Sequence, residues 1–201
     1  MSKGAKIGIV LACVLVVVGG IYKFFAGNYN TMVSLEETVS SAWSQEDNQY
    51  QRRMDLIPNL VSTVKGYAAH ESQVFTDIAE ARSKAGGVVN VDSSIVDDPQ
   101  KLAEYQKVQN QLGASLQRLL AVTENYPALK ANENFLALQN ELEGTENRIA
   151  VERKRFNDAV QTYNSFIRKF PANIVANMNG FEKKSYFTAE AGANQAPKVE
   201  F

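Results

Sequence analysis

The chain has 201 residues, of which 45% are hydrophobic and 21% charged, a composition typical of a globular protein with room for one domain of ordinary size. Lys3, Lys6 and Lys23 flank the first apolar stretch, which leaves 18 basic against 22 acidic residues in the rest and argues against a nucleic-acid-binding surface. Cys13 is the only cysteine and His70 the only histidine, which excludes an intrachain disulfide and leaves too few ligands for a histidine metal site or a Ser-His-Asp triad.

The first apolar stretch, IGIVLACVLVVVGGIY, holds sixteen uncharged residues between Lys6 and Lys23. As a helix rising ~1.5 Å per residue it is roughly 24 Å long, and the flanking lysines and aromatic residues can extend it across a bilayer core of ~30 Å. We therefore expect a transmembrane anchor at residues 7–27. Lys3, Lys6 and the amino terminus outweigh Lys23 in positive charge, so the positive-inside rule puts residues 1–6 in the cytoplasm and the folded part across the membrane.

Two alternatives remain open for this stretch. A cleaved signal peptide needs a small-x-small cleavage site, and Phe24 is too large for the minus-three position of a site at Ala26. A lipoprotein would use Cys13, but few apolar residues precede this cysteine and the apolar run continues well past it.

Beyond the anchor, apolar residues recur at intervals of three and four, the spacing of one face of a helix. A first stripe covers residues 29–50 and a second covers residues 57–85, after which Gly86 and Gly87 can end a helix. The segment VVNVDSSIVDD that follows has turn residues and no helical period, so we expect a loop of about a dozen residues there.

Two more helices follow this loop. Asp98 suits the N-cap of a helix whose stripe covers residues 102–126 and which Pro127 closes. Asn132 can cap a fourth helix of nearly forty residues, which Pro171 ends.

Helices this long with narrow apolar stripes bury them best by antiparallel packing at small crossing angles. We therefore predict an all-α fold, in which an N-terminal transmembrane helix precedes an elongated antiparallel bundle of long helices at residues 28–188. The stretch NIVANMNGFEKKSYF beyond Pro171 is expected to fold back on the bundle. The small, polar residues 189–201 are expected to form a mobile tail.

The motif RRMDLIPNLV places charged residues beside a proline, and its first interpretation is a structural hinge made of Arg52, Arg53, Asp55, Pro58 and Asn59. Proline has no amide hydrogen and discourages helical torsions in the residue before it, so we expect the chain to bend or restart here. Asp55 would then accept hydrogen bonds from the first turn of the new helix, and the two arginines would complement the end of the old one.

A second interpretation gives the arginines a partner. Either Arg52 or Arg53 could hold a carboxylate of the fourth helix or of another protein in a bidentate contact, with Glu146 and Glu152 as candidates.

Three stretches make the chain similar to the LemA family of bacterial membrane-anchored proteins. They are YNTMVSLEETVSSAWSQEDNQYQRRMDLIPNLVSTVKGYAAHE, then YPALKANENFLALQNELEGTENRIAVERKRFNDAVQTYN, and the closing APKVEF. Ala81-Arg82 also matches, whereas Phe156 stands where the family often has tyrosine. The resemblance implies a single anchor in the bacterial inner membrane and a long antiparallel helical domain, and it implies no catalytic reaction.

The favoured function is a non-enzymatic scaffold or adaptor, because an anchored rod offers long faces for contacts with other membrane or envelope proteins or with its own copies. The main alternative is a sensor or regulator of another membrane protein, such as a protease. An enzyme would depend on pairs such as Asp47 with Arg52 or Glu146 with Glu152, and no motif of fixed spacing supports them. We predict no catalytic residue, cofactor, metal or nucleic-acid partner.

The carboxyl terminus carries one more hypothesis. Val199 and Phe201 put apolar side chains at the third-last and last positions, the pattern that carboxylate-binding grooves capture by strand addition. The alternative is a plain tail whose Phe201 packs on its own bundle.

Overall fold

The computed structural model describes residues 2–88 and 93–188, and within these ranges all regular structure is helical. In chain order the elements are α1 (Lys3–Lys65), α2 (Ser72–Val88), the 3-10 helix η1 (Ser93–Asp97), α3 (Pro99–Thr123), α4 (Pro127–Lys130), α5 (Glu133–Arg168) and α6 (Ala172–Asn179). The predicted all-α fold, a long apolar N-terminal helix followed by a helical bundle, is confirmed. The predicted tail at 189–201, with Val199 and Phe201, lies outside the described residues.

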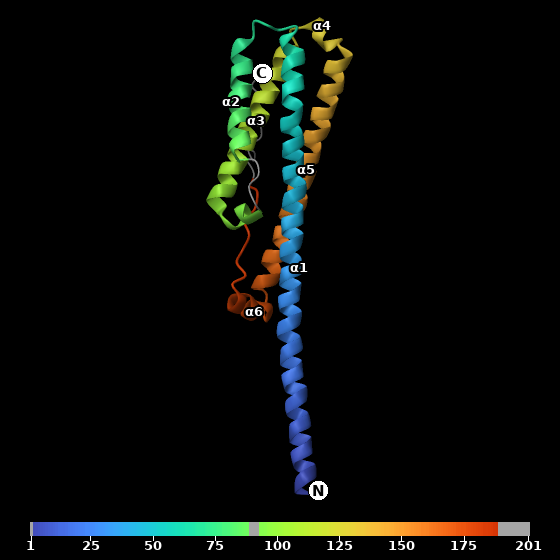
Figure 1. The fold of residues 1–201 in the computed structure, drawn as a ribbon, viewed down its shortest axis with the longest axis vertical. Coiled ribbons are helices and arrows are strands. Elements are labelled where there is room, and N and C mark those ends of the chain that lie inside the picture. The colour runs from blue at the N-terminus through green and yellow to red at the C-terminus, as the bar shows by residue number, and fades with distance from the viewer. Residues whose placement is uncertain (1, 89–92, 189–201) are drawn as a thin grey trace, which may run out of the picture.

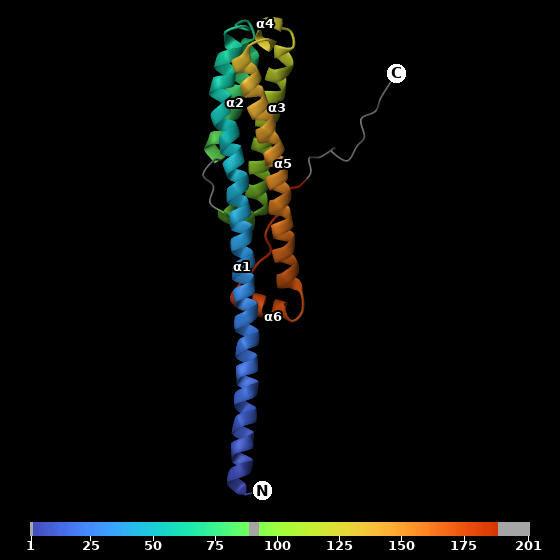
Figure 2. The same ribbon diagram turned by 90° about the vertical axis from the view of Figure 1, so that its right-hand side faces the viewer.

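The bundle consists of two antiparallel helix pairs (Figure 1). In one pair α1 lies against α5, and in the other α2 lies against α3. Long side chains bridge the two pairs, for example the rings of Trp43 on α1 and Tyr105 on α3, whose centroids are 5.1 Å apart. Figure 2 shows that the amino-terminal part of α1 extends alone beyond the end of the bundle.

Two apolar clusters fill the bundle. The core nearer to the bare part of α1 is rich in aromatic residues, among them Trp43, Tyr50 and Phe156. The core at the opposite end is mainly aliphatic, with Leu60 of α1 and Leu112 of α3 fully or almost fully buried. Most residues of the stripes that predicted the helices therefore meet in these cores, but Tyr29, Tyr67 and Phe170 are exposed.

Side chains cap the helices where the sequence indicated. Asp98 accepts hydrogen bonds from the amides of Gln100 and Lys101 at 2.9 and 3.2 Å, and Asn132 accepts one from Phe135 at 3.0 Å. Both predicted N-caps are confirmed. α3 already ends at Thr123, and Pro127 starts the short helix α4 instead of closing α3.

The predicted break at Pro58 is wrong, because α1 continues as a helix through this proline to Lys65. Proline leaves the carbonyl four residues earlier without its helical donor, and here that carbonyl belongs to Met54. Arg82 Nε of α2 donates to the Met54 oxygen at 3.5 Å and so replaces the missing amide. Tertiary structure thus supports a helix that local preference would interrupt.

The chain turns seven residues after the proline instead. Val64 O accepts hydrogen bonds from the amides of Tyr67 and Ala68, and a turn connects this point to α2 at Ser72. The stripe predicted for residues 57–85 is consequently shared by two antiparallel helices. Its first part faces the core from α1, and its second part faces the core from α2.

Beyond α5 the chain folds back on the bundle, as predicted. α6 lies across the end of the bundle and ends at Gly180, whose positive φ of 74° is the left-handed conformation that terminates a helix. Residues 181–188, which we call the return segment, then run back between the two helix pairs (Figure 1). Phe187 of this segment is buried in the aromatic core.

The substitution Pro58→Ala supplies an amide hydrogen for the Met54 carbonyl, so we expect it to raise the free energy of unfolding by about 1–3 kcal/mol. Arg82→Met should lower it by about 0.5–1 kcal/mol in the natural chain and by clearly less in the Pro58→Ala background, because the carbonyl then has another donor. Urea unfolding in mild detergent, followed by circular dichroism, measures both effects. Lys84→Met on the same helix is the control, and strictly additive effects would contradict this account.

Candidate functional site

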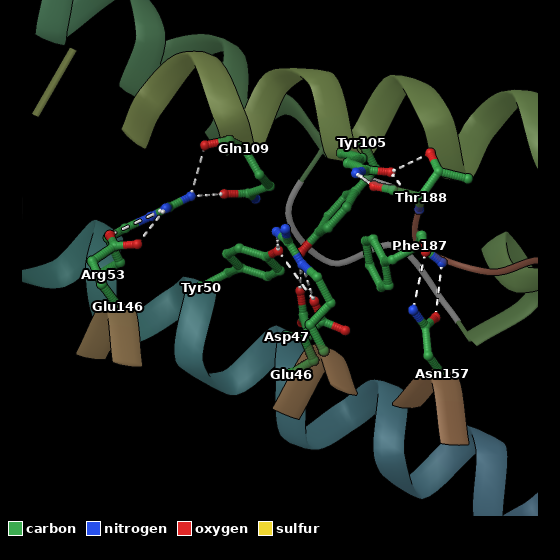
Figure 3. A network of polar contacts seen from close by, with 12 residues as sticks. Glu46, Asp47, Tyr50, Arg53, Tyr105, Gln109, Glu146, Asn157, Phe187 and Thr188 are labelled. Atoms are coloured by element: carbon green, nitrogen blue, oxygen red, sulfur yellow. Dashed lines mark hydrogen bonds and ion pairs between the residues drawn. The ribbon is translucent and has the colours of Figure 1, made fainter. Parts of the chain in front are cut away.

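A network of buried polar side chains crosses the middle of the bundle (Figure 3). Its residues on α1 are spaced so that they share the face that meets α3 and α5. The network contains Glu46, Asp47, Tyr50 and Arg53 of α1, Tyr105, Gln106 and Gln109 of α3, and Glu146, Arg153 and Asn157 of α5.

The centre of the network is Glu46, whose exposed fraction is 0%. One of its carboxylate oxygens accepts a hydrogen bond from the Tyr50 hydroxyl at 3.1 Å and lies 3.5 Å from Arg153 Nε. Burial raises the pKa of Glu46 to about 7, although the nearby Arg153 charge acts in the opposite direction. Glu46 is therefore a carboxyl group that changes its charge near neutral pH inside a protein core.

The two tyrosines of the network are held in the neutral form. Arg153 donates to the Tyr50 hydroxyl at 2.5 Å, and the Tyr105 hydroxyl donates to Asp47 at 2.9 Å. Burial raises the pKa of both hydroxyls, with further contributions from Glu46 for Tyr50 and from Asp47 for Tyr105. The hydroxyls therefore serve as hydrogen-bond donors that position the carboxylates.

Arg53 joins three helices. It donates from one nitrogen to both the backbone oxygen and the side-chain oxygen of Gln109, at 2.9 and 2.6 Å. Its other terminal nitrogen lies 3.2 and 3.4 Å from the two carboxylate oxygens of Glu146. The guanidinium also lies over the Tyr50 ring, 5.1 Å from its centroid. This geometry agrees with the interpretation of an arginine that holds a carboxylate of the fourth helix, although one nitrogen makes both contacts to Glu146.

The other residues of the expected hinge lie on the exposed side of a continuous helix. Arg52 pairs with Glu141 of α5 at 2.8 Å, and both side chains are about half exposed. Asp55 accepts a hydrogen bond from Gln51 within α1 and caps no helix. Asn59 supplies only its backbone oxygen, to the Thr63 hydroxyl. These side chains therefore form no common site with Pro58.

The two acid-base pairs considered from the sequence are not assembled in this structure. Asp47 bonds to Tyr105 while Arg52 bonds to Glu141. Glu152 bonds to Arg155 at 2.8 Å while Glu146 bonds to Arg53. Within residues 2–88 and 93–188 there is also no group of three histidine, cysteine or acidic side chains placed to hold a metal ion.

The return segment is extended, and side-chain amides form the backbone hydrogen bonds that a neighbouring strand would form in a sheet. The amide group of Asn157 both donates to and accepts from the backbone of Phe187, with both distances 3.0 Å. Asn164, two turns further along α5, pairs in the same way with the backbone of Lys184 at 2.9 Å. Gln106 of α3 makes the equivalent contacts with Thr188 (Figure 3). These amides hold the extended chain in a fixed register between α3 and α5.

Charge also fixes the return segment. Lys184 Nζ lies 2.6 Å from Glu36 of α1 and 2.7 Å from Asp97 of η1. Burial acts to lower the pKa of Lys184, but the two carboxylates outweigh it and the pKa is raised. Lys184 therefore stays charged and ties three separate parts of the chain together.

Open clefts lie beside the network, between α3 and α5. One has a volume of about 350 Å³ and is lined by Arg53, Arg153 and Glu146 among others. A second of the same volume follows toward α4 and has Leu116, Leu120 and Leu142 in its wall. The arginines beside the first cleft already have partners within the bundle, so the arrangement mainly holds helices together and leaves an open surface beside them.

Comparison with known proteins agrees with this picture. A model of the LemA family matches residues 42–201, which include the whole polar network. Magnetosome protein MamQ 2 of Paramagnetospirillum magneticum is 29% identical over 189 residues, or 85% of this chain and 68% of that protein. MamQ of Magnetospirillum gryphiswaldense is 28% identical over 177 residues, or 79% and 64% of the two chains. Protein LemA of Metamycoplasma hominis is 22% identical over 162 residues, or 81% and 69%.

The titration of Glu46 predicts how stability changes with pH. Between its ordinary pKa of 4.5 and about 7, the folded state keeps a proton that the unfolded chain has released. The free energy of unfolding should therefore fall by about 2–3 kcal/mol as pH rises through this interval, and Glu46→Gln should remove this fall. Urea unfolding at several pH values measures it, with Glu37→Gln, an exposed residue of α1, as the control. An unchanged pH dependence in Glu46→Gln would contradict the assignment.

The amide pairing of the return segment predicts a second effect on stability. Asn157→Leu keeps the volume of the side chain but leaves the amide and carbonyl of Phe187 without these partners, so we expect a loss of about 2–4 kcal/mol. Asn140→Leu, on an exposed part of α5, should change the free energy of unfolding by less than about 0.5 kcal/mol. The fluorescence of Trp43, whose ring stacks on that of Phe187 with the centroids 6.0 Å apart, reports whether the return segment has moved out of the core. Equal effects of the two substitutions would contradict this role.

Proposed function

The chain belongs to the LemA family, and from this premise we propose that it is a single-pass scaffold or adaptor that acts through protein–protein contacts. The apolar helix and the family membership make it a membrane-associated protein. In the proposal, residues 7–27 cross the membrane and residues 28–188 form the part that meets partners. Partners are other membrane or envelope proteins or further copies of this chain.

The observation that carries the proposal is the continuity of α1. The most apolar window of this helix has no buried residue, whereas its later part supplies Met32, Trp43, Tyr50 and Leu60 to both cores of the bundle. One helix of 63 residues, roughly 95 Å at 1.5 Å per residue, therefore serves both parts. A flexible linker would let the bundle move freely, but this helix holds it at a fixed distance from the membrane surface.

The side of the bundle formed by α3 and α5 offers a surface for partners. The two clefts lie one after the other along it, with arginine and glutamate side chains beside one and leucine side chains beside the other. An amphipathic helix of a partner fits such a surface. Its apolar side chains can pack on the leucines of one cleft while its charged side chains pair with the arginine and glutamate side chains beside the other.

The proposed orientation follows from charge. Lys3 and Lys6 stay with residues 1–6 in the cytoplasm, and the bundle lies on the outer or periplasmic side of the inner membrane.

One observation favours a second candidate, a sensor or regulator of another membrane protein such as a protease. Glu46 has a pKa of about 7 and contacts Arg153, whose guanidinium lies over the ring of Phe187 in the return segment. A change in the charge of Glu46 therefore acts through Arg153 on a contact that holds Phe187 of the return segment. An enzyme is less well supported, because most polar side chains of the network contact one another and the acid-base pairs considered from the sequence are not assembled.

Photo-crosslinking in intact membranes tests the partner surface. A photoreactive residue at Asn147, in the wall of the leucine-lined cleft, should give one defined crosslinked product, whereas the same residue at Asn134 on another side of α5 should give none. The mass in mild detergent then distinguishes the candidates. A defined oligomer supports the scaffold, and a monomer bound to one membrane protein supports the regulator. A monomer with no crosslink at Asn147 would refute both.

A further inference from the structure

The end of the bundle next to the bare part of α1 carries three large apolar side chains that the fold leaves exposed. Phe170 is 81% exposed, Met178 68% and Ile174 45%. They are spaced four residues apart, so Ile174 and Met178 share one side of α6 and Phe170 precedes them in the turn. We call these three residues the end patch.

The opposite side of α6 faces the bundle. Ala172, Val175 and Ala176 on that side are at least 95% buried and belong to the aromatic core. α6 lies across the end of the bundle in both views (Figures 1 and 2). The end patch is therefore on the side of α6 that points away from the rest of the folded domain.

α6 is also fixed at a definite height on α1. It packs against α1 and α5, and Phe181, which directly follows it, has its ring 5.6 Å from the ring of Tyr29. Phe24 and Phe25 of α1 are partly buried against the same core. Tyr22 and Ile21, exposed apolar residues of the bare helix, precede Phe24 and Phe25 by two to four residues, which is only about 3–6 Å along the axis at 1.5 Å per residue.

Charged residues next to the end patch are mainly basic. Arg168 and Lys169 are exposed where α5 ends, and Lys23 is exposed on α1 close to the same level. Lys183 is exposed in the return segment, beside the exposed Glu182. Basic side chains around exposed apolar ones are typical of surfaces that lie in the headgroup region of anionic membranes.

We propose that the end patch rests on the lipid bilayer that α1 enters, with Phe170, Ile174 and Met178 in the interfacial layer and the basic residues among the headgroups. This inference rests on the proposed membrane span. A protein partner would also cover apolar side chains, but the patch lies at the height where the same chain leaves the apolar part of its own helix. The bundle thus contacts the membrane at a second point, which restricts its tilt and its rotation about α1.

Environment-sensitive fluorophores on single cysteines of the full-length protein test the proposal in vesicles of phosphatidylcholine and phosphatidylglycerol. The natural Cys13 reports on the span. In a Cys13→Ala background, Met178→Cys and Ile174→Cys report on the end patch, and Ala128→Cys in α4 reports on the far end of the bundle. We expect labels at 13, 174 and 178 to be quenched several-fold more by a lipid-attached nitroxide than by aqueous iodide, and the label at 128 to show the reverse.

The outcomes separate this inference from the proposed span. A lipid-quenched label at 13 with iodide-quenched labels at 174 and 178 overturns the end-patch contact and leaves the span intact. A label at 178 that neither quencher reaches overturns it in favour of a protein cover, such as a second copy. Lipid quenching at 178 without lipid quenching at 13 supports the contact and refutes the span, and iodide quenching at all positions refutes both.

Discussion

Most polar groups buried between the two helix pairs find partners within the protein, although Glu46 Oε2, Arg53 Nε and Gln109 Nε2 accept or donate no hydrogen bond. This pairing organises the middle of the bundle. The terminal nitrogens of Arg53 donate to Gln109 and Glu146. The side chain of Asn157 bonds to both the amide and the carbonyl of Phe187. An unpaired polar group here would cost about 1–3 kcal/mol, and an unpaired charge more. The partners lie on α1, α3, α5 and the return segment, so satisfying them also fixes the relative positions of these elements.

The long α1 helix depends on the same kind of compensation. Pro58 removes a hydrogen bond in the middle of the helix, and Arg82 of α2 supplies a donor to the freed Met54 carbonyl. Packing of α2 against α1 therefore helps to keep α1 helical at this proline. The stiff connection from the apolar segment to the far end of the bundle is in this sense a property of the whole domain and not of the helix alone.

The sequence predicted the features that depend on neighbouring residues. Apolar spacing predicted the helices, and Asp98 and Asn132 were correctly assigned as caps because capping needs only a side chain and the next turn. The break at Pro58 was wrong because the donor that rescues it lies on α2. The amide pairing of Asn157 and Asn164 was also missed, although two asparagines seven residues apart beside an apolar stripe are a detectable signal. Their partners are backbone groups of an extended segment, which no side-chain pattern identifies.

The end patch, the return segment and Glu46 form one continuous series of contacts. α6 leads directly into the return segment, where Phe187 lies 5.3 Å from the Arg153 guanidinium that approaches Glu46. Burial is the main cause of the raised pKa of Glu46, so if moving Phe187 out of the core admits water to this carboxyl group, its pKa falls toward the ordinary value. By linkage, ionisation of Glu46 would then weaken the binding of the return segment to the bundle by the same free energy. A contact of α6 with lipid would hold the start of that segment in place, and it would therefore favour the protonated form of a carboxyl group in the middle of the bundle.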